Sequence, residues 1–407
     1  MSNKNGKERK TPKLRFPGFT GEWEERKLGE MGITYTGLSG KTREDFGHGD
    51  GRFVTYMNVF LNPISDLTKT ETIEIDKAQN NVRYGDVFFT ASSETPEEVG
   101  MSSVWLGNIE NIYLNSFCFG YRPTVEIFPY YMAYMLRSEA VRRKIIYLAQ
   151  GISRYNISKK SVMEIKVPVP DLAEQKKIGE YFRKVDHLII LQQNKMEHVK
   201  KLKKGLLQKM FPRKGEDMPE LRIPGFSDAW EQRQFSDFAQ RESLIQTSSY
   251  DCPSVEYEDV IVEEGCLNKD IRLKEVQKTG IKFDGAQVLY GKLRPYLHNW
   301  LKPDFMGVAV GDWWVLRPVE IDKNFLYRLI QTKKFDDVAN QSSGSKMPRA
   351  DWNLVSQSEF MVPTSLKEQC RIAEVFEGLD HLITLHQRKL DHLKQLKKGL
   401  LQQMFIM

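Results

Sequence analysis

The sequence predicts an α+β protein in which two globular domains are joined by two long antiparallel, coiled-coil-like helices, as an internal repeat with approximate twofold symmetry. Three observations predict this architecture. The chain has 407 residues, more than a single hydrophobic core usually holds. It contains a duplicated sequence framework, and both copies of that framework end in an amphipathic stretch of helical periodicity. Apolar residues make up 40% of the chain and charged residues 28%, which is typical of globular domains.

The duplication consists of two matched blocks. Residues 12–26 (PKLRFPGFTGEWEER) return as residues 219–233 (PELRIPGFSDAWEQR), and residues 174–211 return as residues 368–405 with 23 of 38 positions identical. The segments between the blocks differ in length and in sequence. A constant framework around two divergent inserts indicates two globular halves with related but distinct roles. The alternative is sequence drift after a gene duplication.

The blocks divide the chain into four segments. We expect an N-terminal globular domain at residues 1–170, a first helix with its linker at 171–215, a C-terminal globular domain at 216–364 and a second helix at 365–407. Pro212 ends the first helix, because proline cannot continue one.

Both matched C-terminal blocks predict long helices. Apolar residues recur at heptad-like spacing from Val185 to Leu206 and from Leu379 to Leu400. Asp171 predicts an N-cap for the first helix. Such narrow stripes need a partner helix, and the other copy is the obvious one. Thirty-eight residues span roughly 57 Å, so the pair would form a spacer of defined length.

The globular halves combine strands with short helices. Strands are expected at 51–60, 85–90 and 307–316, where β-branched and aromatic residues lie between turn formers. Helical periodicity is present at 130–148 and 325–338. Each half is therefore predicted to be α+β.

The near-motifs for catalysis are all incomplete. Residues 37–42 (GLSGKT) end like a phosphate-binding loop, but Tyr35 stands where its first glycine is required. The adjacent pair Asp186-His187, repeated in the second helix, cannot act together, since neighbouring helix residues point about 100° apart. Helix packing or a subunit interface is the better interpretation of these pairs. We therefore predict no catalytic residue and no metal site in this chain.

Charge and cysteine content suggest where the protein works. The formal net charge of +6 is compatible with nucleic-acid binding without requiring it. The four cysteines are widely spaced in the sequence and are expected to be reduced thiols. Residues 1–13 have no apolar core, and no apolar run approaches membrane-spanning length. A cytoplasmic protein without a membrane partner is expected.

Together, the repeat, the helical stripes and the LRFPGF and KKGLLQ blocks resemble the specificity subunit of Type I restriction-modification systems. The resemblance covers nearly the whole chain and is most specific in the duplicated segments that begin at Glu174 and Glu368. Residues 85–90 (GDVFFT) and 290–296 (YGKLRPY) look like parts of that family's target-recognition domains.

The resemblance implies a non-catalytic subunit that recognises a split site in double-stranded DNA. Each target-recognition domain would recognise one half of the site, and the helices would fix the spacer and hold two modification subunits. S-adenosylmethionine, ATP and Mg²⁺ would bind to the modification and restriction (translocase) subunits, with no cofactor in this chain.

Base recognition needs side chains such as Arg, Lys, Asn and Gln on loops that face a DNA groove, while Lys, Arg, Ser and Thr also contact phosphates. The loops before the helical blocks, at 151–156 and 344–349, occupy similar places in the two halves. The DNA-binding candidates are Lys41, Thr42, Arg43, Tyr56, Asn58, Thr90, Ser92, Ser93, Arg154, Tyr155, Asn156, Lys159, Lys292, Arg294, Tyr296, Ser345, Lys346 and Arg349.

Two other functions remain open from the sequence. A helical scaffold with two protein-binding domains would show the same repeat, but DNA affinity that falls steeply with ionic strength would argue against it. A self-sufficient nuclease or methyltransferase is disfavoured by the incomplete motifs. An assay of the purified chain alone would decide that question.

Overall fold

The computed structural model describes residues 11–213, 215–274, 276–341 and 347–406. It divides into two compact units. Unit 1 consists of Met1–Gln193 and Arg388–Met407, and unit 2 of Asn194–Gln387. These boundaries cut both long helices, so each unit contains the beginning of one helix and the end of the other. The four-segment division by sequence remains a prediction.

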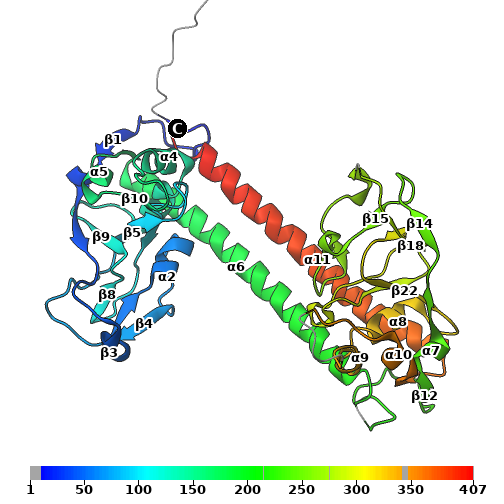
Figure 1. Cartoon of the computed structure of the whole chain (residues 1–407). Coiled ribbons are helices and arrows are strands. Elements are labelled where there is room, and N and C mark those ends of the chain that lie inside the picture. The colour runs from blue at the N-terminus through cyan, green and yellow to red at the C-terminus, as the bar shows by residue number, and fades with distance from the viewer. Residues whose placement is uncertain (1–10, 214, 275, 342–346, 407) are drawn as a thin grey trace, which may run out of the picture. The chain divides into compact units, whose positions relative to one another are not determined.

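The two long helices are confirmed. α6 spans Leu172–Lys209 and α11 spans Leu366–Gln403, both continuous over 38 residues (Figure 1). Asp171 caps α6 as expected, since its Oδ1 accepts a hydrogen bond of 2.8 Å from the Glu174 amide. Among the described residues, no helix is long and apolar enough to cross a membrane.

Within unit 1 the two helices run antiparallel. Phe182 of α6 packs against Phe405, just beyond the end of α11, and further along α6 Asp186 forms an ion pair of 2.5 Å with Lys397. In unit 2 the same pairing recurs, with Asp380 of α11 2.7 Å from Lys203 of α6. The aspartates of the repeated Asp-His pairs therefore join the two helices within each unit.

The predicted apolar stripes are only partly buried. Val185 and Leu390 are buried, but other stripe residues are largely exposed. These exposed residues are Leu188 (51%), Leu202 (46%), Leu382 (44%) and Leu396 (43%). The two helices therefore pair as predicted, but only part of each apolar stripe is buried. A straight helix drifts about 20° per heptad, so a contact between two helices follows a strict heptad stripe only over part of its length.

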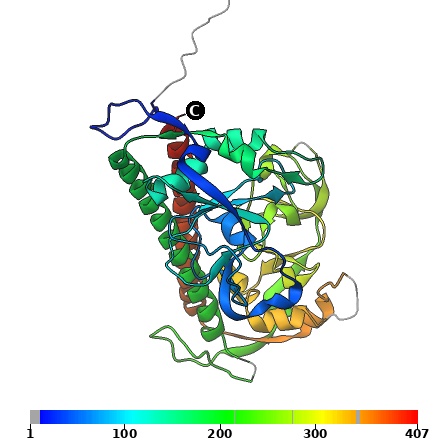
Figure 2. The same ribbon diagram turned by 90° about the vertical axis from the view of Figure 1, so that its left-hand side faces the viewer.

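Unit 1 contains a four-stranded antiparallel sheet in the order β2-β9-β5-β7 and a three-stranded sheet in the order β4-β3-β8. The strands of these two sheets, coloured blue to cyan, are seen from a second side in Figure 2. The strands of unit 1 are β1 Glu24–Lys27, β2 Gly32–Thr36, β3 Phe46–Val54, β4 Thr70–Ile73, β5 Val87–Thr90, β6 Ser92–Ser93, β7 Ser102–Val104, β8 Ile112–Leu114, β9 Cys118–Pro123, β10 Tyr155–Asn156 and β11 Lys166–Val169. The short helices are α1 Leu28–Met31, η1 Arg43–Asp45, α2 Tyr56–Leu61, α3 Pro129–Leu136, α4 Glu139–Tyr147 and α5 Lys159–Met163.

Unit 2 repeats the first of these sheets, in the order β13-β22-β19-β20, but its second sheet has four strands in the order β14-β18-β21-β15. Its strands are β12 Glu231–Gln234, β13 Ala239–Glu242, β14 Ile245–Thr247, β15 Ser254–Val255, β16 Val260–Ile261, β17 Cys266–Leu267, β18 Thr279–Phe283, β19 Val288–Gly291, β20 Trp300–Leu301, β21 Gly307–Ala309, β22 Trp313–Pro318 and β23 Glu359–Val362. Its short helices are α7 Phe235–Phe238, η2 Tyr257–Asp259, η3 Ile271–Leu273, η4 Pro295–Leu297, α8 Lys323–Leu329, α9 Lys333–Ala339 and α10 Trp352–Gln357.

The α+β class is confirmed, with local corrections. The strand expected at 51–60 ends at Val54, and α2 begins at Tyr56 because the Thr55 side chain accepts a hydrogen bond from the Asn58 amide. The strand expected at 307–316 is two strands separated by a turn at Gly311. The helices expected at 130–148 and 325–338 are each two short helices.

The duplicated Glu-Gln pair explains how each globular half joins its helix. The buried Glu174 carboxylate accepts hydrogen bonds from Arg15 (2.7 Å) and from the Trp23 indole (3.0 Å). The buried Gln175 side chain accepts from the Phe128 amide and donates to the Pro170 carbonyl.

Unit 2 repeats these contacts. Glu368 accepts hydrogen bonds from Arg222 and Trp230. Gln369 accepts from the Asp322 amide and donates to the Pro363 carbonyl. The matched blocks are therefore joined to each other within each unit.

Candidate nucleic-acid interface

Three loop segments meet at one end of the four-stranded sheet of unit 1. They are the residues after β5, the turn before β9, and the loop before α5. The Ala91 amide donates to the Phe117 carbonyl (2.9 Å), and the Ile157 amide donates to the Ala91 carbonyl (3.0 Å). Asn156 pairs with Ser92 across the β10-β6 ladder. We call this arrangement junction 1.

Unit 2 repeats the arrangement with other residues, and we call it junction 2. The Lys292 amide donates to the Asp312 carbonyl (2.9 Å), and the Ala350 amide donates to the Lys292 carbonyl (2.8 Å). Leu293 and Arg349 form a β-bridge that corresponds to the pair in unit 1. The same backbone scaffold therefore carries different side chains in the two units.

Junction 1 contains many of the candidates from the first half. The Tyr56 hydroxyl donates to the Ser92 carbonyl (2.7 Å), and the Ser93 hydroxyl donates to Glu98 (3.1 Å). The Arg154 guanidinium lies 6.0 Å from the centre of the Phe117 ring. The structure also places Tyr155 and Asn156 in β10, and Lys159 at the start of α5 next to it.

Two candidates in the first half have structural roles. Asn58 is 2% exposed, and its amide donates to the carbonyls of Asp66 and Lys69 while its oxygen accepts two hydrogen bonds. This uses the full capacity of the amide group. Thr90 is 0% exposed, and its hydroxyl accepts from the Met101 amide. We therefore reassign Asn58 and Thr90 from DNA contact to structural support.

The candidates at 41–43 belong to a different part of unit 1. The Lys41 ammonium pairs with Asp76 (2.9 Å), and Thr42 is hydrogen-bonded to Asp45 at the start of η1. Arg43 is exposed in η1. The hydrogen bond between Lys41 and Asp76 lowers the pKa of that carboxyl to about 2. The side-chain contacts of Lys41 and Thr42 are thus to η1 and to the loop after β4.

Junction 2 gathers the second set of candidates around Asp312. Its carboxylate lies 3.5 Å from the Lys292 ammonium and 3.1 Å from Nη2 of Arg349. The Arg349 guanidinium beside Asp312 lowers the pKa of that carboxyl. The Arg294 amide donates to the Pro348 carbonyl, which joins the two candidate loops.

The other candidates of the second half lie beside junction 2. Tyr296 is 53% exposed within η4. Arg294 adopts a left-handed backbone conformation with φ +49°, uncommon for a residue other than glycine. Ser345 and Lys346 lie outside the described residues.

Sequence reasoning missed Asp312, Phe117 and Tyr257, which hold the junctions together. The Tyr257 hydroxyl donates to the Asp312 carbonyl (2.5 Å) and accepts from the Leu293 amide (3.0 Å). These residues are far apart in the sequence and match no motif. The one local signal in the sequence, for Asp312, was the pair Gly311-Asp312, which is typical of a turn, directly before an aromatic strand.

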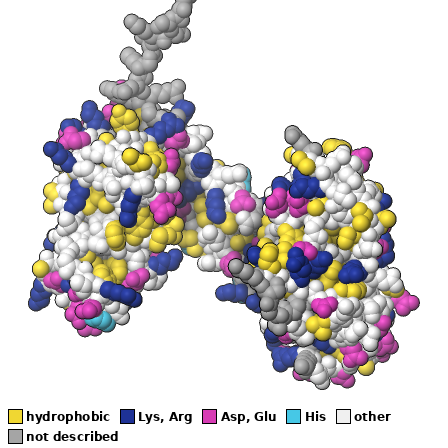
Figure 3. Space-filling view, in the orientation of Figure 1, with side chains coloured by type: hydrophobic (Ala, Val, Ile, Leu, Met, Phe, Trp, Pro, Cys, Tyr) yellow, Lys and Arg dark blue, Asp and Glu magenta, His cyan; other side chains and the backbone are white. Residues whose placement is uncertain are grey.

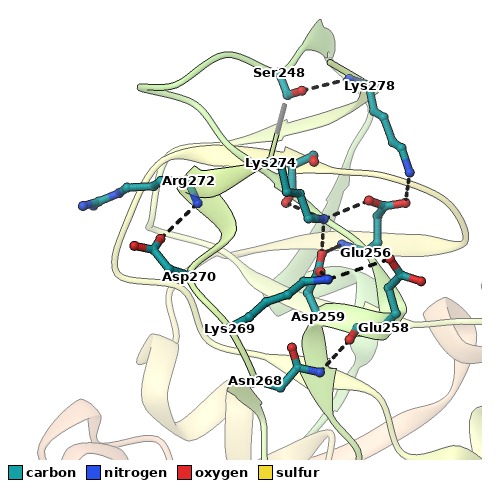
Figure 4. A network of polar contacts seen from close by, with 11 residues as sticks. Ser248, Glu256, Glu258, Asp259, Asn268, Lys269, Asp270, Arg272, Lys274 and Lys278 are labelled. Carbon is teal, nitrogen blue, oxygen red and sulfur yellow. Dashed lines mark hydrogen bonds and ion pairs between the residues drawn. The ribbon is translucent and has the colours of Figure 1, made fainter. Parts of the chain in front are cut away.

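A network of lysines surrounds Glu256 and Asp259, the carboxylates on either side of Tyr257 in the sequence (Figure 4). Lys274 pairs with both Glu256 (2.8 Å) and Asp259 (2.5 Å), Lys278 pairs with Glu256, and Lys269 pairs with the buried Asp259. Because Glu256 and Asp259 flank Tyr257 in the chain, the network holds η2 in place.

His298 connects the η4 loop to two other elements. Its Nδ1 lies 3.0 Å from Glu263 and its Nε2 lies 3.0 Å from Asp336 of α9, and its ring stacks on Trp300. The hydrogen bond to Asp336, reinforced by Glu263, raises the pKa of His298 above its ordinary value. The η4 loop that carries Tyr296 is therefore attached through a titratable group.

We expect the stability of unit 2 to depend on the charge of His298. A folded pKa above the unfolded value of about 6.5 means that the stabilisation is fully present below that pH and is lost as the pH rises through the folded pKa. The urea midpoint of the wild type should therefore fall relative to that of His298→Gln as the pH increases from 6 to 9. Parallel curves for the two proteins would contradict this role.

Surface charge alone does not mark an interface. On the face shown in Figure 3, lysine and arginine side chains are interspersed with aspartate and glutamate on both units. Within the described part of the chain, no group of three or more His, Cys, Asp or Glu residues is placed to hold a metal ion. The arrangement of the junctions, with polar and cationic side chains on a repeated scaffold, is suited to recognition.

Comparison with known proteins identifies the family. The family model described as Type I restriction modification DNA specificity domain matches residues 20–201 and 301–395, more than half of the chain. The chain belongs to this family. Junction 1 lies wholly within the first matched region, and Asp312 and Arg349 of junction 2 lie within the second.

Several relatives carry the same family name. The chain is 23% identical to the Type I restriction enzyme MjaVIII specificity subunit of Methanocaldococcus jannaschii over 62% of this chain and 64% of the relative. It is 25% identical to the EcoDI specificity subunit of Escherichia coli over 58% and 60% of the two chains. It is 34% identical to the StySPI specificity subunit of Salmonella potsdam over 28% and 24%. The matches span between 24% and 64% of the length of these curated relatives.

Solved structures share the fold. The crystal structure of a Type I restriction-modification system S subunit from M. genitalium has a TM-score of 0.59 at 13% identity, over 97% of this chain and 99% of that one. A chain from a study of complex assembly and conformational transition in the type I R-M system has a TM-score of 0.58 at 14% identity, over 96% and 98%. The specificity-domain fold is thus present despite low sequence identity.

Proposed function

We propose that this chain is the DNA sequence-specificity subunit of a Type I restriction-modification complex, and that each unit recognises one half of a bipartite target. The observation that carries the proposal is the pair of junctions. The same three backbone segments meet in both units, but the side chains they present differ. A backbone arrangement that is repeated in both units but carries different polar side chains suits the recognition of two different base sequences.

The charges at the two junctions support contact with DNA. Arg154 and Lys159 lie at junction 1, and Lys292, Arg294 and Arg349 lie at junction 2. Such side chains bind phosphates and the acceptor-rich edges of guanine. The names of the relatives from E. coli and Salmonella support the same function.

The long helices would set the spacer between the half-sites and bind two modification subunits. Each helix has 38 residues, or about 57 Å at 1.5 Å per residue. Each unit also exposes a set of helix leucines: Leu188, Leu191 and Leu396 in unit 1, and Leu202, Leu382 and Leu385 in unit 2. Because the sets occupy matching positions in the repeat, each is suited to bind one copy of the same apolar partner surface.

Catalysis in this proposal belongs to the partner subunits. S-adenosylmethionine would bind the modification subunits, and ATP and Mg²⁺ would serve the restriction subunits that translocate and cleave DNA. The complex would work in the cytoplasm, where it meets double-stranded DNA.

Methylation mapping tests the proposal. In cells that express this chain with a modification subunit, we expect one split motif, methylated on both strands. The double variant Arg154→Ala/Asn156→Ala should change one half-site and leave the other half and the spacer unchanged. A modification subunit expressed without this chain provides the control. A continuous motif, or no methylation with an active partner, would exclude the proposed function.

A further inference from the structure

The pair formed by Asp312 and Arg349 has a defined geometry. Nε of Arg349 lies 3.3 Å from Oδ1 of Asp312, and Nη2 lies 3.1 Å from Oδ2. The carboxylate therefore meets one edge of the planar guanidinium. Because the guanidinium is a rigid fork, fixing this edge also fixes the direction of its other edge. The Arg349 side chain is 52% exposed, so the guanidinium lies at the surface of unit 2.

Asp312 itself is held from several sides. Its carbonyl accepts hydrogen bonds from the Lys292 amide and the Tyr257 hydroxyl. The next residue, Trp313, is 1% exposed and contacts the Tyr257 ring edge-on at 4.7 Å. The network around Glu256 and Asp259 fixes the turn that carries Tyr257 (Figure 4). The backbone from which the Asp312 side chain extends is thus held in place.

The charge of Asp312 fits a role in orientation. Lys292 and Arg349 both pair with it, and the Arg349 guanidinium lowers its pKa, so Asp312 is ionised at neutral pH. One carboxylate between two cations leaves a net positive charge at the junction. A cation held by a carboxylate is pre-organised, which reduces the entropy lost on binding.

Unit 1 has a different side chain at the corresponding position. Like Asp312, Phe117 directly precedes the second strand in the order of its sheet, β9, and its carbonyl accepts the equivalent backbone hydrogen bond, from the Ala91 amide. Its ring lies beneath the Arg154 guanidinium at 6.0 Å. An arginine thus lies against this position in both units, although Arg349 corresponds to Asn156, not Arg154, in the backbone pairing. Only in unit 2 is the arginine's partner a carboxylate.

We propose that Asp312 is a positioning residue that directs Arg349 toward a guanine in the half-site recognised by unit 2. This inference rests on the proposed function. Arginine donates two hydrogen bonds to O6 and N7 of guanine in the major groove, a contact that no other base offers in the same geometry. Asp312 thereby contributes to specificity without contacting a base itself.

The experiment maps methylation by the full chain co-expressed with its modification subunit. Arg349→Gln should relax one guanine position of the split motif. Asp312→Asn should relax the same position, with the preference for guanine falling about tenfold, since a bidentate arginine–guanine pair discriminates by roughly 5- to 150-fold. Asp312→Glu keeps the carboxylate and should retain part of the preference. The other half-site should remain unchanged in all three variants.

Asp284→Asn is the matched control, because Asp284 pairs with Arg317 in unit 2 away from the junction (2.8 Å). It should leave the motif intact. If the wild type gives no split motif, the proposed function fails. If it gives one that Arg349→Gln leaves unchanged, or changes at a position without guanine on either strand, this inference alone fails. If Asp312→Asn abolishes all methylation while Arg349→Gln relaxes a guanine, Asp312 supports the fold and its positioning role is rejected.

Discussion

Replacing Phe405 with alanine is expected to destabilise unit 1 by about 3–5 kcal/mol and to leave unit 2 folded. Phe405 is 2% exposed and fills the space between Trp23 (6.4 Å between ring centres), Tyr131 (5.7 Å) and Phe182 (6.0 Å). Removing the ring leaves a cavity among large aromatic groups that cannot easily collapse. The C-terminal end of the second repeat is therefore part of the core of the first unit.

Hydrogen exchange resolved by peptide measures the two units separately. In Phe405→Ala, amides of β5 and β9 should exchange faster, while those of β19 and β22 keep the wild-type rate. The matched variant is Phe211→Ala, because Phe211 packs against Trp230, Phe325 and Phe376 in unit 2. It should give the opposite pattern. Equal acceleration in both units, or none in unit 1, would show that the C-terminal contact does not support unit 1.

The first block of the repeat explains why each unit contains the beginning of one long helix and the end of the other. The periodicity of the sequence does not reveal these contacts. The blocks at 12–26 and 219–233 each contact the beginning of one helix and the end of the other. In unit 1 the Leu14 amide donates to the Gln403 carbonyl, and in unit 2 the Leu221 amide donates to the Lys209 carbonyl. A short motif thus contacts residues nearly 400 positions away, and such pairings are invisible in a single sequence.

The helices could be predicted because each carries its own signals over 38 residues. The globular halves were harder, since short elements carry weak signals. Thr55 caps the N-terminus of α2 by accepting a hydrogen bond from the Asn58 amide. Because this cap lies within a run of β-branched and aromatic residues, the sequence of α2 resembled that of a strand. The exposure of Leu188 and Leu382 could not be foreseen either, because an apolar position indicates burial without naming the surface that covers it.

The candidate site was predicted in part. Arg349 and Lys292 share a junction because two loops carry cationic side chains to the same sheet end. Asp312 was missed because a single aspartate in a turn is ordinarily a turn former. Asn58 was chosen as a candidate because its residue type suits base recognition. In the structure its amide group donates hydrogen bonds to backbone carbonyls of its own loop. Residue type alone does not separate these cases.

Replacing Arg15 with methionine should destabilise unit 1 by about 3 kcal/mol, because it leaves the carboxylate of Glu174 buried without its cation. Glu174 is 0% exposed, and its hydrogen bonds to Arg15 join the N-terminal block to the beginning of α6. A chemical unfolding curve followed together with hydrogen exchange in β1 and β11 measures the effect. The equivalent variant, Arg222→Met, should act on unit 2 through Glu368.

A second substitution separates the charge from the packing. Glu174→Gln removes the charge and keeps an oxygen that accepts from the Trp23 indole, so Arg15→Met/Glu174→Gln should recover part of the stability lost in Arg15→Met alone. Combining Arg15→Met with Arg222→Met should give additive losses, since the two pairs lie in different units and share no partner. If the double variant with Glu174→Gln is less stable than Arg15→Met, the loss comes from the packing of the Arg15 side chain, and the buried charge is not its cause.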